Sequence, residues 1–108
     1  MGALEKPMMT AAEYLARERA AATKSEFCDG EIFAMAGTSK NHARIVMNFA
    51  GELRALLKGR KCEPFASDLR VKVEASGLYT YPDLLVVCDD AQFEDAHLDT
   101  LLNPALII

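Results

Sequence analysis

The sequence predicts an α/β (α+β) fold in which helices pack against a central mixed β-sheet. Three observations predict it: one long segment has apolar residues at helical spacing, a later segment alternates with a period of two, and a continuous apolar run follows. The chain has 108 residues, of which 51% are hydrophobic and 26% charged, which fits one small domain and excludes a disordered chain. No stretch approaches the ~20 apolar residues of a membrane-spanning helix, so we expect no membrane partner.

A capping box predicts the start of the first helix. Thr10 is followed three positions later by Glu13, so each side chain can accept a hydrogen bond from the other residue's backbone N–H. The residues that follow are rich in Ala, Glu and Arg, which favour helices, and we expect a helix over residues 11–22. Residues 1–9 carry no such signal and are expected to form a flexible leader.

A β-hairpin is predicted after this helix. Asp29-Gly30 supplies the positive φ angles of a tight hairpin turn, and short apolar segments flank it. The expected strands cover residues 26–28 and 31–35.

The longest helix is predicted over residues 40–58. Ser39 is a suitable N-cap, and Gly59 is a suitable residue to end the helix. Its apolar residues recur at a spacing of three and four and form one stripe. The stripe consists of Ile45, Val46, Phe49, Leu53, Leu56 and Leu57.

The second half of the chain predicts strands. Residues 67–74 alternate between apolar and polar side chains, which indicates a strand with one polar face. Ser76-Gly77 predicts a turn, and the continuous apolar run at residues 84–88 is typical of a strand buried on both faces. An acidic loop or short helix is expected through Asp99, before a last apolar strand over residues 106–108.

The cysteines and the N-terminus bear on the cellular compartment. Cys28, Cys62 and Cys88 are scattered, odd in number and without a C-x-x-C pair. We therefore expect reduced thiols, with neither a disulfide framework nor a zinc site. The N-terminus lacks the apolar run of a signal peptide, so we expect a cytoplasmic protein.

The charge distribution argues against a strongly basic nucleic-acid-binding protein. The net charge is −4, and residues 82–108 contain six acidic residues and neither Lys nor Arg. Residues 31–81 have a net charge of +3. In the long helix, the basic residues are either a solvated face or phosphate contacts, and the solvated face is favoured because acids outnumber bases. These residues are Lys40, Arg44, Arg54 and Lys58.

Asp83 is the most informative candidate for a functional residue. It stands immediately before the most apolar run, where a carboxylate is costly unless it is solvated, paired or bound to a cation. If Ser76-Gly77 is a two-residue turn, Arg70 lies opposite Asp83, and Asp68 lies nearby on the same face. An Arg70–Asp83 ion pair is one interpretation. The other is that Asp68 and Asp83 share a hard cation such as Mg²⁺.

Two further polar residues have both an ordinary and a functional interpretation. His42, at the start of the long helix, is either a core-edge histidine bonded to backbone or an imidazole aimed at the polar end of the sheet. The positive end of the helix dipole also favours phosphate there. Glu31 follows the Asp29-Gly30 turn and is an exposed hairpin residue in the simpler interpretation. His97 reads only as a solvated surface residue.

Taken in order, these segments resemble the Uma-type endonuclease family. Singly the motifs are weak, but together they cover nearly the whole chain from Met9 onward. The matching segments are Tyr14-Leu15, Glu26-Phe27-Cys28-Asp29-Gly30-Glu31-Ile32, Met35-Ala36-Gly37, Asn41-His42, Ser67-Asp68-Leu69-Arg70-Val71, Tyr79-Thr80-Tyr81-Pro82-Asp83-Leu84-Leu85-Val86 and Asn103-Pro104-Ala105-Leu106-Ile107-Ile108.

The resemblance implies a restriction-endonuclease-like, PD-(D/E)xK fold and metal-dependent hydrolysis of phosphodiesters in nucleic acid, with DNA as the expected substrate. It implies that Asp83 is the main ligand of Mg²⁺ (or Mn²⁺), with Asp68 or Glu31 as auxiliary carboxylates. His42 would then orient water or phosphate. The metal would bind the scissile phosphate and lower the pKa of the attacking water.

The sequence departs from the family at its C-terminus. In the family, the strand that matches residues 106–108 continues into a Glu-Val element with the second metal-binding carboxylate. Residues 10–108 are therefore expected to form the N-terminal part of a single domain, and this chain alone is expected not to cleave DNA. The alternative is a non-catalytic module that keeps the fold for binding or self-association, and the apolar C-terminus suggests a homodimer.

Overall fold

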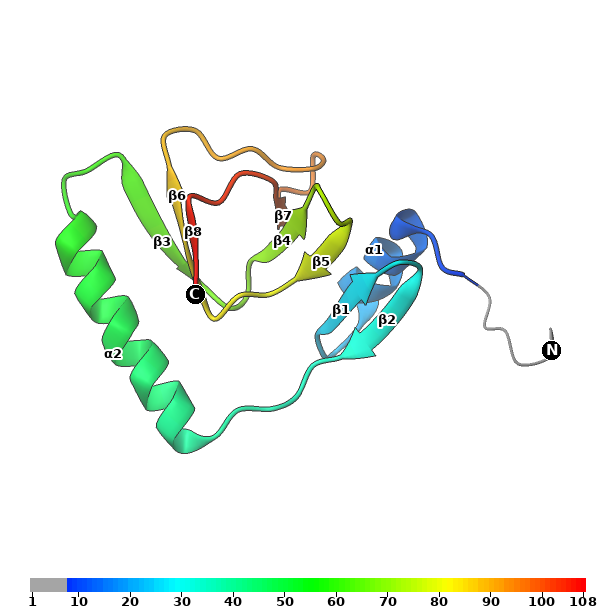
Figure 1. Ribbon diagram of the computed structural model, residues 1–108, viewed down its shortest axis with the longest axis horizontal. Coiled ribbons are helices and arrows are strands. Elements are labelled where there is room, and N and C mark those ends of the chain that lie inside the picture. Colours follow the sequence, from blue (N-terminus) through cyan, green and yellow to red (C-terminus); the bar gives the residue numbers. More distant parts are fainter. Residues whose placement is uncertain (1–7) are drawn as a thin grey trace.

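The computed structural model describes residues 8–108, and residues 1–7 of the expected leader lie outside the described residues (Figure 1). The side chain of Met9 packs against a core cluster, and its N–H donates a 3.0 Å hydrogen bond to the carbonyl oxygen of Gly30. Burial of an apolar side chain next to the hairpin favours this position. The flexible leader stays a prediction.

Helix α1 covers Ala11–Ala20, and the Thr10–Glu13 capping box that predicted its start is present in both directions. The helix ends two residues before the expected end. The hairpin follows, with β1 at Ser25–Cys28 and β2 at Glu31–Ala34.

The predicted turn of the hairpin is confirmed. Asp29 and Gly30 have φ angles of 52° and 77°, and Cys28 pairs with Glu31 across the turn. These are the left-handed conformations that an Asp-Gly turn supplies. Residues 35–39 then run as an extended segment from β2 to the start of α2 (Figure 1).

Helix α2 covers Lys40–Leu57, as its caps predicted. The Ser39 hydroxyl accepts a 3.1 Å hydrogen bond from the N–H of His42, and Gly59 follows the end of the helix with a φ of 79°. Although the apolar period is present, no residue of α2 is buried. One row of its side chains is half-buried and includes three residues of the predicted stripe, while the other three residues of the stripe are exposed. The half-buried row is Val46, Ala50, Leu53 and Leu57, and the exposed apolar residues include Ile45, Phe49 and Leu56.

The remaining strands complete two sheets. They are β3 at Cys62–Ala66, β4 at Arg70–Val73, β5 at Leu78–Thr80, β6 at Leu84–Cys88, β7 at Thr100–Leu101 and β8 at Leu106–Ile107. The five-stranded sheet has the order β2-β1-β5-β4-β7, in which only the β4–β7 pair is parallel. The three-stranded sheet has the order β3-β6-β8 and is antiparallel. The predicted combination of a mixed sheet with flanking helices is confirmed.

The predicted register between residues 67–74 and the following strand is wrong. Val73 pairs with Leu78, so four residues form the turn instead of two, and the register shifts by two positions. Asp83 therefore does not lie opposite Arg70. It lies beyond the end of β5, where the chain crosses from the five-stranded sheet to β6 in the other sheet.

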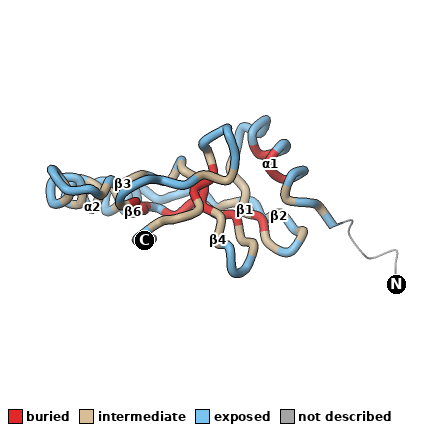
Figure 2. The backbone as a smooth tube through the Cα atoms, turned by 90° about the horizontal axis from the view of Figure 1, so that it is seen from above, coloured by how far each residue is buried: buried red, intermediate tan, exposed pale blue. Residues whose placement is uncertain are grey.

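The buried residues lie where α1 and the two sheets meet (Figure 2). One cluster packs Tyr14 and Leu15 of α1 on Phe27 and Tyr79 of the hairpin and β5. A second joins the sheets: Leu85 and Val87 of β6 contact Val71 of β4 and Leu101 of β7. The expectation that residues 84–88 form a buried strand is confirmed, since its first four residues are buried.

The acidic segment between β6 and β7 forms a loop and no helix among its described residues. Phe93 forms an isolated bridge with Leu101. Of the two structures expected for this segment, a loop or a short helix, the loop is therefore the one observed.

The helices of the described residues include none that is long and apolar enough to cross a membrane.

The structure contains a disulfide between Cys62 and Cys88, which face each other as a pair between β3 and β6. The expectation of three reduced thiols is wrong for these two residues. Their sequence separation of 26 gave no sign of their proximity, which arises only when the two strands pair. Cys28 is free and half-buried.

Candidate active site

The structure brings together two of the predicted site residues, His42 and Asp83. The His42 Nε2 lies 3.2 Å from the Asp83 Oδ2, and both side chains are 49% exposed. His42 belongs to the first turn of α2, which the Ser39 cap holds in place. Asp83 precedes β6, the most buried strand, and follows the buried Pro82, which restricts the backbone there. The pair thus joins residues 41 positions apart at one solvent-accessible place.

Asp68 lies elsewhere. Its Oδ1 is 2.7 Å from the Lys24 Nζ, and its side chain is 93% exposed. Lys24 also donates a 3.0 Å hydrogen bond to the Ser67 carbonyl oxygen. Since the β4–β5 register differs from the predicted one, the geometric reason for placing Asp68 beside Asp83 no longer holds, and its metal role stays a prediction.

Glu31 lies at the start of β2, an edge strand of the five-stranded sheet, where it pairs with Cys28 and is exposed. Its carboxylate makes no ion pair with any described residue. Its auxiliary role, like that of Asp68, stays a prediction.

The side chains at Asp83 fit a divalent metal only in part. A carboxylate that is half exposed offers the hard oxygen ligand that Mg²⁺ prefers, and Mg²⁺ commonly binds one or two carboxylates and several waters. Within residues 8–108, however, no group of three or more His, Cys, Asp or Glu side chains is arranged to hold a metal. Asp83 therefore fits as one ligand, and the described residues do not supply a complete protein site.

A buried polar network beside this site was missed by the sequence analysis. The Tyr81 hydroxyl donates a 2.5 Å hydrogen bond to Glu18 of α1 and accepts one of 3.0 Å from the Arg70 Nη1. Arg70 also donates a 2.8 Å hydrogen bond to the Thr100 hydroxyl. Its Nη2 lies 3.0 Å from the Asp99 Oδ1 as an ion pair. Arg70 thus has Tyr81, and not Asp83, as its neighbour from the crossing segment.

This network affects the pKa of the Tyr81 hydroxyl. Burial raises the pKa of Tyr81, and the hydrogen bond to the Glu18 carboxylate raises it further, so the hydroxyl remains a donor. The signal that could have revealed the network is Glu18 itself. It lies four positions after Tyr14 on the buried face of α1, where a carboxylate needs a partner.

Two cyanobacterial proteins are similar in sequence. The chain is 42% identical over 100 residues to the uncharacterized protein sll1609 of Synechocystis, covering 93% of this chain and 56% of that protein. It is 34% identical over 102 residues to the uncharacterized protein slr1290 of the same organism, covering 94% and 53%. The chain thus spans about half the length of the curated relatives it matches.

A solved structure shares the fold. The crystal structure of a putative nuclease belonging to DUF820 from Anabaena variabilis superimposes with a TM-score of 0.64 at 22% identity, covering 74% of this chain and 43% of that one. This likeness confirms the restriction-endonuclease-like fold that the resemblance implied.

The match to a family model completes the comparison. The model of Uma2, described as a putative restriction endonuclease, covers residues 11–108, which is almost the entire described chain. Fold and family together support a nuclease-type function. The protein therefore belongs to the Uma2 family of putative restriction endonucleases.

Proposed function

We propose that this chain carries the Asp83 part of the active site of a Mg²⁺- (or Mn²⁺-) dependent endonuclease that hydrolyses phosphodiester bonds in DNA. The observation that supports the proposal most is the contact between His42 and Asp83, 3.2 Å apart and open to solvent, in a chain of a nuclease family. The proposed compartment is the cytoplasm, where such a nucleic-acid substrate is found.

Asp83 would hold the metal through its carboxylate, with Asp68 or Glu31 as auxiliary carboxylates in a catalytic arrangement. When bound, the metal would stabilise negative charge on the scissile phosphate and lower the pKa of the attacking water. His42 lies close enough to Asp83 to orient that water or a phosphate oxygen by a hydrogen bond. It also lies in the first turn of α2, where the helix dipole favours an anionic group.

We further propose that the 108-residue chain alone does not cleave DNA. The support is the incomplete donor set: residues 8–108 contain no group of three or more side chains placed to hold a metal. One carboxylate and one imidazole leave the metal weakly held and the charge of the transition state poorly balanced.

A plasmid-nicking assay with Mg²⁺ and Mn²⁺ tests both parts. The chain alone is expected to leave supercoiled plasmid intact, while sll1609, of which the matched region is 56%, is expected to nick it. In sll1609, replacing the residue that aligns with Asp83 by Asn should abolish nicking, and replacing the residue that aligns with the exposed Arg17 should not. Robust cutting by this chain that Asp83→Ala abolishes would contradict the proposed inactivity. Nicking by sll1609 that survives the Asn replacement would contradict the role of Asp83.

A second candidate is a non-catalytic module that associates with itself. The observation that favours it is strand β8, at the edge of the three-stranded sheet, whose apolar residues are 43–47% exposed: Leu106, Ile107 and Ile108. An exposed apolar edge strand is a template for pairing with a second chain. Light scattering over a range of protein concentrations tests this candidate, and a homodimer is the expected assembly.

A further inference from the structure

The positive charge of this acidic protein is concentrated in one segment. Residues 40–61, which comprise α2 and the loop after it, contain six Lys and Arg and one Glu, a net charge of +5, while the whole chain has −4. The charge of the wider segment, residues 31–81, conceals this concentration because acidic residues on either side offset it. A local potential of this kind attracts anions even when the protein is acidic overall.

Four of these cations lie on one face of α2. With 3.6 residues per turn, positions 40, 44, 54 and 58 fall within about 80° of one another around the helix axis. All four side chains belong to exposed residues. We call this surface the basic face, and it consists of Lys40, Arg44, Arg54 and Lys58.

The fold does not neutralise the basic face. The cations Arg19, Lys24, Arg70 and Lys72 form ion pairs within the described residues, and all lie outside α2 and its following loop. By contrast, no residue of the basic face forms an ion pair with a described residue. Like charges without internal partners repel one another, so this face gains most from an external polyanion.

The other faces of α2 are already defined. The half-buried row, which includes Val46 and Leu53, lies toward β3, and the exposed apolar residues Ile45, Phe49 and Leu56 form another side. The basic face lies on the side of the helix axis opposite these apolar residues. A partner or second copy that covers the apolar residues would therefore leave the basic face accessible.

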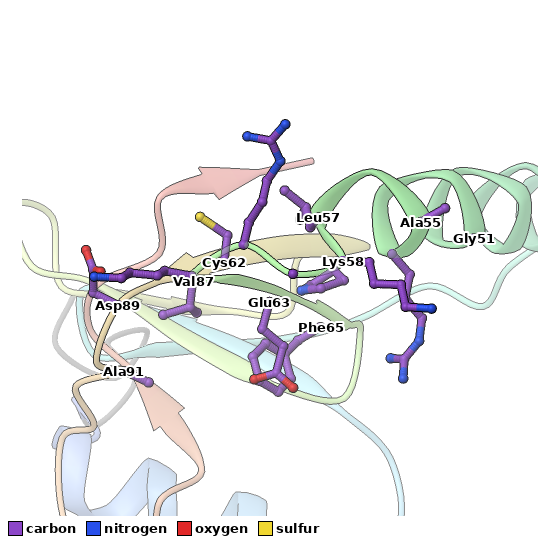
Figure 3. Close-up of a pocket in the computed structure, with 15 residues that line it drawn as sticks. Gly51, Ala55, Leu57, Lys58, Cys62, Glu63, Phe65, Val87, Asp89 and Ala91 are labelled. Atoms are coloured by element: carbon purple, nitrogen blue, oxygen red, sulfur yellow. The ribbon is translucent and has the colours of Figure 1, made fainter.

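A surface hollow extends the basic face at the C-terminal end of α2. It has a volume of about 850 Å³, and Arg54 and Lys58 line it together with Arg60 and Lys61 of the loop. Figure 3 shows Lys58 on the helix side of this hollow, with Glu63 and Asp89 beside the strands. Cationic side chains therefore outnumber the acidic ones along its wall.

We propose that the basic face of α2 binds the phosphate backbone of a double-stranded nucleic acid. The inference goes beyond the proposed function, because it concerns duplex binding by α2 and not the chemistry at the His42–Asp83 site. Lys40 is two positions from His42, and the 18 residues of α2 span about 27 Å, the rise of about eight base pairs. At about 100° per residue, however, His42 lies about 160° from Lys40 and Arg44 around the helix axis, so the basic face is a binding surface separate from the His42–Asp83 contact.

Duplex binding in EDTA, where metal-dependent cleavage cannot occur, tests the inference separately from the proposed function. Fluorescence anisotropy of a labelled 20-base-pair DNA would measure the affinity of the 108-residue chain over a series of salt concentrations. Arg54→Gln/Lys58→Gln is expected to weaken binding at least tenfold near 0.1 M salt. It should also reduce the slope of log K against log salt by about 2, since each phosphate contact contributes about 0.9.

Arg17→Gln is the control for the double variant, because Arg17 is an exposed α1 cation without an ion pair among the described residues. It should change neither affinity nor slope, and circular dichroism should show all variants folded. Equal losses with duplex RNA would support recognition of phosphate alone.

Two outcomes would overturn the inference. One is a double variant that binds DNA as tightly as the unmodified chain. The other is a chain that binds phosphatidylserine vesicles through Arg54 and Lys58 but does not bind DNA. Neither outcome touches the nicking result for sll1609, so failure of this inference is distinguishable from failure of the proposed function.

Discussion

At the scale of single residues, the partner of Arg70 decides the environment of Asp83. Tyr81 occupies the place beside Arg70 that the two-residue turn would have given to Asp83. The guanidinium is buried with Tyr81, Thr100 and Asp99, so it is unable to neutralise Asp83. Asp83 is left with the imidazole of His42, a partner that a metal can displace more easily than an arginine.

Removing the Tyr81 hydroxyl is expected to destabilise the fold. Tyr81→Phe leaves the Arg70 Nη1 without this hydrogen-bond partner and leaves the buried Glu18 carboxylate with only the N–H of Ser25. The expected loss in the free energy of unfolding is about 1–3 kcal/mol, measured by urea denaturation. Arg17→Gln, on the exposed side of the same helix, should change it by less than about 0.5 kcal/mol. Equal effects of the two variants would contradict the importance of the network.

Asp99 is expected to give the stability a pH dependence on the acid side. Hydrogen bonds of 2.8 and 2.9 Å from Arg19 are the main cause that lowers the pKa of Asp99, and the charge of Arg70 adds to it. Because the folded pKa lies below the unfolded value of about 3.9, the stabilisation is present above that pH. It is lost as the pH falls through the folded pKa.

Urea unfolding between pH 2 and 7 measures this dependence. Asp99→Asn should lower the stability at pH 7 and flatten the decline below pH 4. Asp90→Asn, which removes an exposed carboxylate without an ion pair among the described residues, is the control and should leave the profile unchanged. A profile for Asp99→Asn that is parallel to that of the unmodified chain would exclude this role.

At the scale of elements, the sequence predicted correctly those helix starts and turns that depend on interactions between neighbouring residues. The Thr10–Glu13 box, the Asp29-Gly30 turn and the Ser39 cap each act over a few residues, and each is present. Prediction failed where packing decides. The turn after β4 has four residues because Val73 pairs with Leu78, and nothing in the Ser76-Gly77 signal fixes the loop length.

In the candidate site, too, local signals predicted some residues correctly, and the predictions that depended on packing failed. The entry of a buried strand marked Asp83 and the helix start marked His42, and the structure brings these two residues together. The sequence misled for Arg70 and Asp68, whose neighbours depend on strand register. The sequence contained no signal for the pairing of Cys62 with Cys88, which exists only because β3 and β6 are neighbours.

The disulfide is expected to stabilise the β3–β6 pair. It closes a loop with a sequence separation of 26, for which the chain-entropy estimate is about 3–4 kcal/mol. Cys62→Ala/Cys88→Ala should therefore lower the midpoint of urea unfolding under non-reducing conditions, and a reducing agent should lower it in the unmodified chain. Cys28→Ala is the control, and thiol titration of the folded chain should detect one free thiol. Three titratable thiols in protein purified without reductant would contradict the disulfide.

At the scale of the whole molecule, much of the exposed apolar surface lies on β8 and α2. The edge strand β8 and the stripe on α2 are both uncovered, while the five-stranded sheet packs against α1 and β6. An uncovered apolar surface of this kind is typical of a place of contact with another polypeptide.

Self-association is expected to use β8. Light scattering should show a concentration-dependent dimer, and Ile107→Glu should shift it to the monomer by placing a charge on the edge strand. Phe33→Glu is the matched control, because Phe33 is an exposed apolar residue on β2, the edge strand of the other sheet. A monomer at all concentrations would argue against the second candidate function and leave the first untouched.

The crossing from β5 to β6 has one more consequence. Tyr81 is anchored to α1 and β4 in one half of the molecule, and Leu84 begins the central strand of the other half. Asp83 therefore lies on the segment that connects the two sheets, while His42 approaches it from α2, which packs against β3. Any rocking of the sheets against each other would change the distance between these two side chains. Catalytic competence would then depend on the rigidity of the interface between the sheets, through substitutions that never touch the substrate.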